Sequence, residues 1–583
     1  MQKNCQKCKK GFVIESEDSN FYEMMKVPGP TFCPECRLVR RLTFRNDRTL
    51  YKRECELCEK EVISIYRPLL NKNGEPSGQT KIVCQKCWWG DDFDAREHGR
   101  DYDFSKSFFE QYHELMKEVP FVANFIVDES RMINSPYNNM ALDLRNCYMM
   151  FDSDFDEDCA YGCEVEKSKN CFDTNLIQKG EMCYECVNIT NCYRAFYSVD
   201  CENSADIYFC RDCNGCTDCF GSVNLRNKSY YIFNQPMGNK ENYEIKLKEL
   251  NISSRKDLER IKDKVKNLWS EGVTKYMHEK QNEKVSGDYI YNSKNVKESW
   301  IVHEGWNLKY CQYLVSPNVK DSYDFTQFGN NVERHYEVLQ GGNGGSNIRF
   351  SWFTPNENTE IDYCMQVMTS KNMFGCIGMR KGEFCILNKQ YTKEEYEALR
   401  SKIILQMQGM PYVDKNGISY SYGEFFPSEV SPFAYNETTA NEFFPLSKEE
   451  VIENGFSWFD REQRNYQPTI LTGDIPDDAS LIPENITSEI LECVNSKKGT
   501  EIEGCTTAFR VIADEANFYK RFNIPLPDKC PNCRHNARMK LRTVPRFHKL
   551  VCSYDGCGKE ILTAYDASTP NLYCKEHYLS SVV

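Results

Sequence analysis

The middle of the chain alternates short apolar pieces with single polar breaks. Aromatic and β-branched residues are interrupted every few positions by Asn, Asp or Gly, a pattern typical of short strands joined by tight turns. The tripeptide Asn-Cys-Tyr/Phe begins at Asn146, Asn170 and Asn191, at spacings of 24 and 21 residues. Two cysteine pairs are each twelve positions apart, Cys147 with Cys159 and Cys171 with Cys183. Units of this length predict stacked rungs of a β-solenoid, with cysteine as a small apolar residue in a narrow interior.

The rung series is predicted to occur twice. Residues 227–250 resemble residues 381–404, because both join an aromatic strand, an Asn turn and a helix start of the form Lys-Glu-x-Tyr-Glu. Helices at such positions would cover the open ends that a solenoid leaves. We therefore expect two β-solenoid-like blocks, at 121–238 and 285–404, with a helical insertion at 239–284 and a capping helix at the end of the second block.

Two further segments connect these parts. Phe108, Tyr112 and Leu115 recur at helical spacing, which predicts a connecting helix within 101–120. Residues 405–485 are rich in aromatic residues and Pro and are expected to form a packed connector.

The two ends of the chain carry the same pattern. Cys-Pro-x-Cys-Arg begins at Cys33 and again at Cys530, and in both copies the next cysteine falls nineteen positions after the second one. A Phe-Tyr pair begins twelve positions before each copy, at Phe21 and at Phe518. Agreement at several fixed offsets predicts a duplicated module, at 1–100 and at 486–583.

Each predicted module contains four pairs of metal-ligating residues, enough for two tetrahedral zinc sites. Three pairs depart from Cys-x2-Cys: Cys493–Cys505 and Cys552–Cys557 are wider, and His577 replaces a cysteine. Because four protein ligands leave no position open for water, the expected role of zinc is structural. The predicted ligand sets are Cys5, Cys8, Cys33 and Cys36; Cys55, Cys58, Cys84 and Cys87; Cys493, Cys505, Cys530 and Cys533; and Cys552, Cys557, Cys574 and His577.

The first of these patterns also supports a resemblance to known sequences. Cys5-x2-Cys8, Phe21-Tyr22 and Cys33-x2-Cys36-Arg37 resemble a small bacterial family of probable zinc-binding domains of the treble-clef or zinc-ribbon type. The whole chain resembles a long cysteine-rich family of uncultivated bacteria that has no assigned activity. The resemblance implies zinc-ribbon modules and supplies no catalytic residue. The wide Cys493–Cys505 spacing departs from the family's pattern.

A basic linker follows the Cys-Pro-x-Cys pair in each module. Residues 37–54 hold seven Arg or Lys and two acids, and residues 534–551 hold six and none, in a chain of net charge −13. Arginine pairs well with phosphate, so these linkers are predicted to bind RNA or DNA, either free or as part of a ribonucleoprotein. The alternative is that the arginines pair with acids elsewhere in the protein. The predicted contacts are Arg37, Arg40, Arg41, Arg45, Arg48, Arg53, Arg534, Arg538, Lys540, Arg542 and Arg546.

Four cysteines at Cys210, Cys213, Cys216 and Cys219 stand at intervals of three. An iron–sulfur cluster, an extra zinc ion and a ladder of buried thiols are the three interpretations, and the position within the repeat array favours the thiols. No cysteine stands apart with a histidine partner, so no nucleophile is predicted.

Composition agrees with a large folded protein of several domains. Of the 583 residues, 40% are hydrophobic and 13% aromatic, and no apolar run is long enough to span a membrane. The first residues lack the apolar stretch of a secretory signal, so a cytoplasmic protein is expected, where cysteine pairs serve as metal ligands. Phosphate-loop, dinucleotide and catalytic-triad patterns are absent. The sequence thus predicts a non-enzymatic zinc protein that binds nucleic acid. The alternatives are a protein-interaction scaffold that uses the solenoid face and an iron–sulfur or thiol redox protein.

Overall fold

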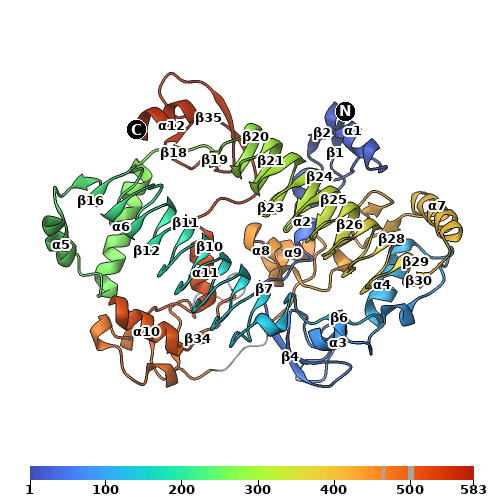
Figure 1. The fold of residues 1–583 in the computed structure, drawn as a ribbon, viewed down its shortest axis with the longest axis horizontal. Coiled ribbons are helices and arrows are strands. Elements are labelled where there is room, and N and C mark those ends of the chain that lie inside the picture. Colours follow the sequence, from blue (N-terminus) through green and yellow to red (C-terminus); the bar gives the residue numbers. More distant parts are fainter. Residues whose placement is uncertain (72, 76, 462–465, 497–503, 583) are drawn as a thin grey trace.

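The computed structural model describes residues 1–582 apart from 72, 76, 462–465 and 497–503. The chain is mostly β-structure with several helices. Two closed tubes of parallel strands, which we call the first coil (139–236) and the second coil (279–390), form its centre (Figure 1).

Each turn of the first coil has twelve residues arranged as four short sides. Asn175 pairs in parallel with Cys163 on the turn before and with Val187 on the turn after. On the sides of a turn that are not regular strands, isolated parallel bridges such as Phe172 with Tyr184 connect one turn to the next. The strands are β7 (Asn139–Leu142), β8 (Phe151–Asp154), β9 (Cys163–Glu166), β10 (Asn175–Gln178), β11 (Val187–Thr190), β12 (Tyr193–Phe196), β13 (Val199–Glu202), β14 (Ala205–Tyr208), β15 (Thr217–Phe220), β16 (Ser229–Ile232) and β17 (Gln235–Pro236).

Several of the polar breaks seen in the sequence are corners of these turns, although apolar residues such as Met149 and Phe155 also occupy corners. Asn146, Asp158 and Asn170 stand at one corner on successive turns, with φ of 52°, 54° and 54°. Asn and Asp enter this left-handed region more readily than other side chains that bear a Cβ. Neighbouring corners also bond to each other, since the Asn146 amide donates to Asp158 over 2.9 Å. The chain therefore turns four times in every twelve residues.

The predicted repeat length was wrong. Asn146 and Asn170 occupy the same corner two turns apart, but Asn191 lies at the neighbouring corner, so its spacing of 21 residues is not a whole number of turns. The twelve-residue spacing of the cysteine pairs is the true period.

Cysteines line the interior of the first coil as a ladder of buried thiols. The sulfur of Cys171 donates to the backbone carbonyls of Lys169, at 3.4 Å, and of Gly180 on the next turn, at 3.5 Å. Its exposed fraction is 0%. The narrow interior suits a small side chain such as cysteine, and the thiol donates to these backbone carbonyls without needing a polar side chain as partner.

The second coil has the same construction with a less regular turn. Lys294 pairs with Trp306, Gly305 with Val319, and Val319 with Val332, which are steps of 12, 14 and 13 residues. Its strands are β19 (Glu279–Lys280), β20 (Glu283–Tyr291), β21 (Lys294–His303), β22 (Gly305–Lys309), β23 (Gln312–Leu314), β24 (Val319–Thr326), β25 (Val332–Leu339), β26 (Ser346–Trp352), β27 (Thr359–Asp362), β28 (Lys371–Phe374), β29 (Glu383–Ile386) and β30 (Lys389–Gln390).

The two coils lie side by side and run in opposite directions (Figure 1). Met140, in the first turn of the first coil, accepts from the Gln340 amide in the middle of the second coil. Asp200, several turns later, accepts a 3.1 Å hydrogen bond from the hydroxyl of Tyr289, at the beginning of the second coil.

Helices cover the coils where the sequence predicts them. The predicted connecting helix is α4 (Phe108–Glu118), whose Phe108 ring packs 5.3 Å from that of Phe374 in the second coil. Within the predicted insertion, α5 (Lys240–Glu249) and α6 (Arg255–Glu271) bury an apolar face against Phe220 and Ile232 of the first coil. The capping box at Thr392 begins α7 (Lys393–Gly409), beside the last strands of the second coil.

The end modules consist of hairpins and short helices. The first module contains β1 (Gln2–Asn4), β2 (Gly11–Val13), α1 (Ser16–Met24), α2 (Pro34–Leu42), β3 (Tyr51–Glu54), β4 (Glu61–Ser64), β5 (Ile82–Val83) and α3 (Gln85–Trp89), with β5 paired to β6 (Phe121–Val122). The second contains β33 (Leu491–Glu492), β34 (Ala508–Phe509), α10 (Ala513–Phe522), α11 (Pro531–Met539), β35 (His548–Val551), β36 (Glu560–Thr563), β37 (Leu572–Tyr573) and α12 (Lys575–Val582), with β37 paired to β18 (Thr274–Lys275).

The connector is packed into the centre of the molecule. Its elements are β31 (Tyr412–Val413), β32 (Ser419–Tyr420), α8 (Thr439–Phe443) and α9 (Lys448–Glu453), and α8 and α9 lie between the coils in Figure 1. Phe425, Phe426 and Phe433 are buried in the main core. In the part of the chain that the structure describes, no helix combines the length and apolar character needed to cross a bilayer.

Candidate metal centres

The structure brings together all sixteen predicted metal ligands in the four predicted sets. Within each set, the ligand atoms lie within 4.8 Å of one another. We number the sets in chain order: site 1 (Cys5, Cys8, Cys33, Cys36), site 2 (Cys55, Cys58, Cys84, Cys87), site 3 (Cys493, Cys505, Cys530, Cys533) and site 4 (Cys552, Cys557, Cys574, His577). All cysteines of the chain are free thiols, so no disulfide competes for these positions.

Each site is assembled from two local structures. One pair of ligands flanks the turn of a two-stranded hairpin, as Cys5 and Cys8 do between β1 and β2. The other pair belongs to the first turn of a helix, which begins after Cys33 in site 1 and after Cys530 in site 3, each followed by Pro at the first helical position. Proline suits that position because its missing N–H has no helical partner there. Each ligand set therefore lies between a hairpin turn and the N-terminus of a helix.

The widely spaced ligands Cys493 and Cys505 are held by the same type of backbone hydrogen bond as Cys5 and Cys8. The backbone N–H of Cys493 donates to the Thr507 carbonyl at 2.8 Å, as that of Cys5 does to Lys10 at 2.9 Å. Residues 497–503, which lie between the two ligands, are outside the described residues.

The distances between ligand atoms fit a tetrahedral zinc ion. At a Zn–S distance of about 2.3 Å, two sulfurs of a tetrahedron are about 3.8 Å apart. The observed sulfur–sulfur distances are 3.7 Å for Cys8–Cys33, 3.8 Å for Cys58–Cys84 and 3.9 Å for Cys493–Cys533. In site 4, the His577 Nδ1 atom lies 3.3 Å from the Cys574 sulfur. The donor sets and their spacing therefore fit four-coordinate zinc.

Backbone N–H groups prepare the thiols for ionisation. The Cys84 N–H donates to the Cys55 sulfur at 3.2 Å, and the Cys574 N–H donates to Cys552 at the same distance. Burial raises the pKa of the Cys55 thiol, but the N–H donors of Cys84 and Cys58 outweigh it and bring the pKa to about 7. Since metal binds the thiolate, these donors favour the binding form.

The predicted nucleic-acid contacts are for the most part buried, which corrects the prediction for those residues. Arg37, Arg40, Arg41, Arg45, Arg53, Arg534, Arg538 and Arg542 are each at most 8% exposed. Side chains enclosed in this way offer no surface to phosphate. The alternative stated from the sequence, pairing with acids elsewhere in the chain, describes most of these residues.

In the first module, the arginines dock α2 onto the second coil. Arg37 pairs with Asp324 at 2.8 Å and Arg40 with Glu337 at 2.7 Å. Arg41 lies 3.1 Å from Asp324 and 3.3 Å from Glu337. Arg40 also pairs with Glu424 of the connector at 2.9 Å.

The second module repeats this docking on the first coil. Arg534 and Arg538, one and five positions after Cys533 as Arg37 and Arg41 are after Cys36, pair with Asp173 at 3.1 and 2.8 Å. The surrounding residues correspond as well, because Arg534 lies over the Tyr161 ring and Arg37 over the Tyr310 ring, at 4.9 and 5.2 Å. Both modules therefore dock through buried arginine–aspartate pairs, the first module on the second coil and the second module on the first coil.

The remaining predicted contacts have partners in the first coil, in the other module or in their own module. Arg45 pairs with Asp152 and Arg542 with Glu164, both in the first coil. The exposed Arg546 pairs with Glu35 of the first module, and Arg48 approaches Asn532, the residue equivalent to Glu35 in the second. The guanidinium of Arg53 donates to the Thr80 carbonyl at 2.7 Å, and Lys540 is exposed.

The four cysteines at 210–219 are the interior residues of one coil turn. Each comes from a different side, and the sulfurs of Cys210 and Cys216 donate to backbone carbonyls of Tyr208 and Asn214, both at 3.6 Å. Among the described residues, they are not one of the groups whose ligand atoms converge.

The sequence reasoning missed the acids that receive the arginines. Asp173 and Asp324 stand at coil corners with positive φ and are fully buried by the docked helices. Each comes directly after an aromatic residue, Phe172 or Tyr323, that packs on the Phe of its module. The shared aromatic–Asp pair was a signal available in the sequence.

No known protein family matches this chain, and no curated protein matches it either.

Proposed function

We propose that the protein is a zinc-stabilised scaffold, in which four structural zinc ions hold the end modules in the shape that clamps the two coils together. The observation that carries the proposal is the convergence of four complete ligand sets. Cys₄ and Cys₃His sets with hairpin and helix ligands suit zinc, and a filled four-ligand shell supports structure and not chemistry.

The zinc sites and the docking contacts are adjacent along the chain. Cys36 and Cys533 are each followed directly by the arginines that enter the coils, Arg37 and Arg534. A zinc ion at site 1 or site 3 fixes the first turn of the helix that carries these arginines. Loss of the ion would free that turn and leave Asp324 or Asp173 buried without part of its countercharge. Zinc binding is thereby coupled to the docking of each module.

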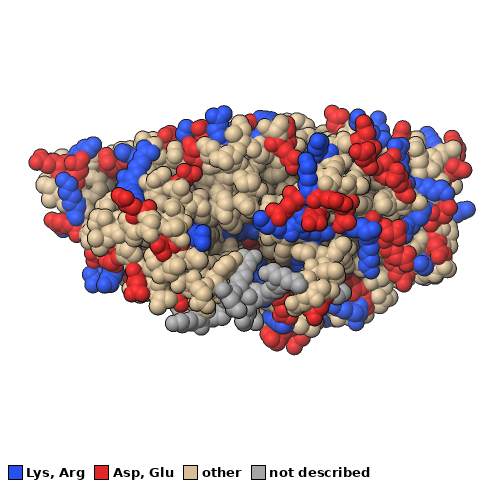
Figure 2. Space-filling model, turned by 90° about the horizontal axis from the view of Figure 1, so that it is seen from below, with Lys and Arg blue, Asp and Glu red and all other residues tan. Residues whose placement is uncertain are grey.

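The working surface of the scaffold, in this proposal, is the uncovered side of the first coil, and its partner is a protein. Charges of alternating sign follow this side from turn to turn, as in the 3.1 Å pair of Lys169 with Glu157, and the Tyr193 ring is 40% exposed. A mixture of Lys and Arg with Asp and Glu is also visible on the face seen from below, where the end modules lie (Figure 2). A mixed surface suits a protein partner better than a polyanion, which needs clustered positive charge. Because its main predicted contacts are buried, nucleic-acid binding is not part of the proposal.

Metal analysis of purified variants tests the proposal. Elemental analysis of the anaerobically purified chain should give four zinc ions per chain. The variant Cys36→Ser should retain three, whereas Cys311→Ser, which changes a buried thiol inside the second coil, should retain four. Small-angle scattering should show expansion when a chelator removes zinc. Purified chain without zinc, or equal zinc in the two variants, would refute the proposal.

A further inference from the structure

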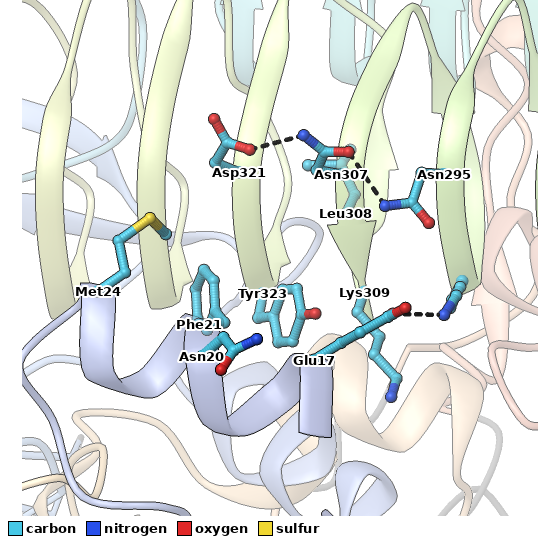
Figure 3. Close-up of a pocket in the computed structure, with 11 residues that line it drawn as sticks. Glu17, Asn20, Phe21, Met24, Asn295, Asn307, Leu308, Lys309, Asp321 and Tyr323 are labelled. Carbon is cyan, nitrogen blue, oxygen red and sulfur yellow. Dashed lines mark hydrogen bonds and ion pairs between the residues drawn. The ribbon is translucent and has the colours of Figure 1, made fainter. Parts of the chain in front are cut away.

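A cleft separates α1 of the first module from the second coil. It has a volume of about 200 Å³ and is open to solvent. Figure 3 shows two rows of side chains facing each other across it: Asn20, Glu17 and Met24 come from α1, and Asn295, Asn307 and Asp321 come from successive corners of the coil. Leu308, Phe21 and Tyr323 supply apolar surface between the rows. The cleft is unrelated to the ligands of the four metal sites.

The corner row is a ladder of two amides and a carboxylate, which we call the amide ladder, with spare hydrogen-bonding capacity. The Asn295 amide donates to Asn307 at 3.0 Å, and the Asn307 amide donates to Asp321 at 2.8 Å. Each amide nitrogen has a second N–H, and each oxygen has a second lone pair. Donors and acceptors therefore alternate along the cleft at the spacing of coil turns, about 4.8 Å.

The cationic groups of the cleft already have partners. Lys297 pairs with Glu17 at 2.7 Å. Lys309 pairs with Asp18 at 2.8 Å and with Glu15 at 2.9 Å. An anionic ligand would have to break one of these pairs, so the cleft suits a neutral ligand. Hydroxyl groups, which both donate and accept, fit alternating amide donors and acceptors.

The apolar part of the cleft suits the C–H face of a sugar ring. Tyr323 stacks on Phe21 with ring centroids 3.9 Å apart, which holds both rings rigidly, and Met24 at the rim is 45% exposed. The three corners extend over about 10 Å, the length of a disaccharide. Rigid aromatic and aliphatic surface beside a few oriented polar groups is the usual composition of a small-ligand site.

We propose that the cleft between α1 and the amide ladder binds a neutral carbohydrate of one or two sugar rings. The sugar hydroxyls bond to Asn295, Asn307 and Asp321, and its C–H face packs on Tyr323 and Met24. The site is independent of the proposed scaffold function, although α1 must be docked for the cleft to exist.

Calorimetric titration of the zinc-loaded full chain tests this proposal. The probes are cellobiose, maltose and N,N′-diacetylchitobiose, each to about 10 mM, since so small a site implies weak binding. At least one probe should bind. Asn307→Ala, which removes a partner of the sugar hydroxyls, and Met24→Ala, which removes apolar surface at the rim, should each weaken binding about fivefold to tenfold.

The matched control is Asn331→Ala. Asn331 accepts from Asn318 at 2.9 Å in a second amide ladder of the same coil, outside the cleft. This variant should bind as the wild type does. Absence of binding by all three probes, or equal affinities of Asn307→Ala and Asn331→Ala, would overturn the proposal. If Asn307→Ala does not fold, Met24→Ala decides the outcome. Four zinc ions per chain in each variant separate this test from that of the scaffold.

Discussion

Removing one carboxylate should release α2 from the second coil. Asp324 is fully buried and receives Arg37 at 2.8 Å and Arg41 at 3.1 Å. In Asp324→Ala, these two buried guanidinium groups share Glu337 alone within the second coil. Breaking a buried pair by removing one partner costs about 3–5 kcal/mol, because the remaining charge is left uncompensated. The free energy of opening α2 should fall by that amount.

Native-state hydrogen exchange measures this opening directly. A loss of about 3 kcal/mol corresponds to a fall in the protection of the α2 amides of more than 100-fold. The matched control is Lys52→Ala, which removes an exposed pair with Glu61 in the same module and should leave the protection of the α2 amides as in the wild type. Protection of α2 in Asp324→Ala within threefold of the wild type would refute the docking argument.

Three further perturbations follow from the structure. In the second module, Asp173→Ala should release α11 as Asp324→Ala releases α2, while site 2 in the first module keeps its zinc. Unchanged hydrogen exchange of the α11 amides would contradict the equivalence of the two modules. Burial disfavours the charged form of His278, but Asp288 and Asp200 outweigh it and raise its pKa to about 9. The charged His278 contributes about 3 kcal/mol to folding stability below pH 6.5, and this contribution is lost as pH rises through 9. The free energy of unfolding should therefore fall less between pH 6.5 and 9 in His278→Gln than in the wild type, and an equal fall would argue against the ion pairs. Gly287 has φ of +139°, and a Cβ there would lie 1.9 Å from the Ser299 carbonyl oxygen. Gly287→Ala should therefore lower the melting temperature, whereas Gly409→Ala, at a position open to solvent, should leave it unchanged.

Local patterns in the sequence were enough to locate the metal centres. Each ligand pair belongs to one hairpin turn or to the first turn of one helix, so its spacing is set by short-range geometry. The duplication then identified equivalent ligands even where the spacing had changed, as at Cys493 and Cys505. The interior cysteines were predictable for a similar reason, since residues twelve apart occupy the same place on successive turns.

Long-range pairing was beyond the same reasoning. The partner of Arg37 is 287 positions away, and nothing in the basic linker distinguishes an arginine that binds phosphate from one that binds a buried carboxylate. The turn length was obscured in the first coil because Asn191 lies at a different corner from Asn146, and in the second coil because its turns differ in length. The cytoplasmic location stays a prediction.

Anomalous X-ray scattering at the zinc absorption edge tests the central claim most directly. A crystal of the untreated protein should give four anomalous peaks per chain, each about 2.3 Å from the sulfurs of one ligand set, including Cys33 in site 1 and Cys530 in site 3. A ligand set without a peak, or peaks that appear at the iron edge instead, would contradict it.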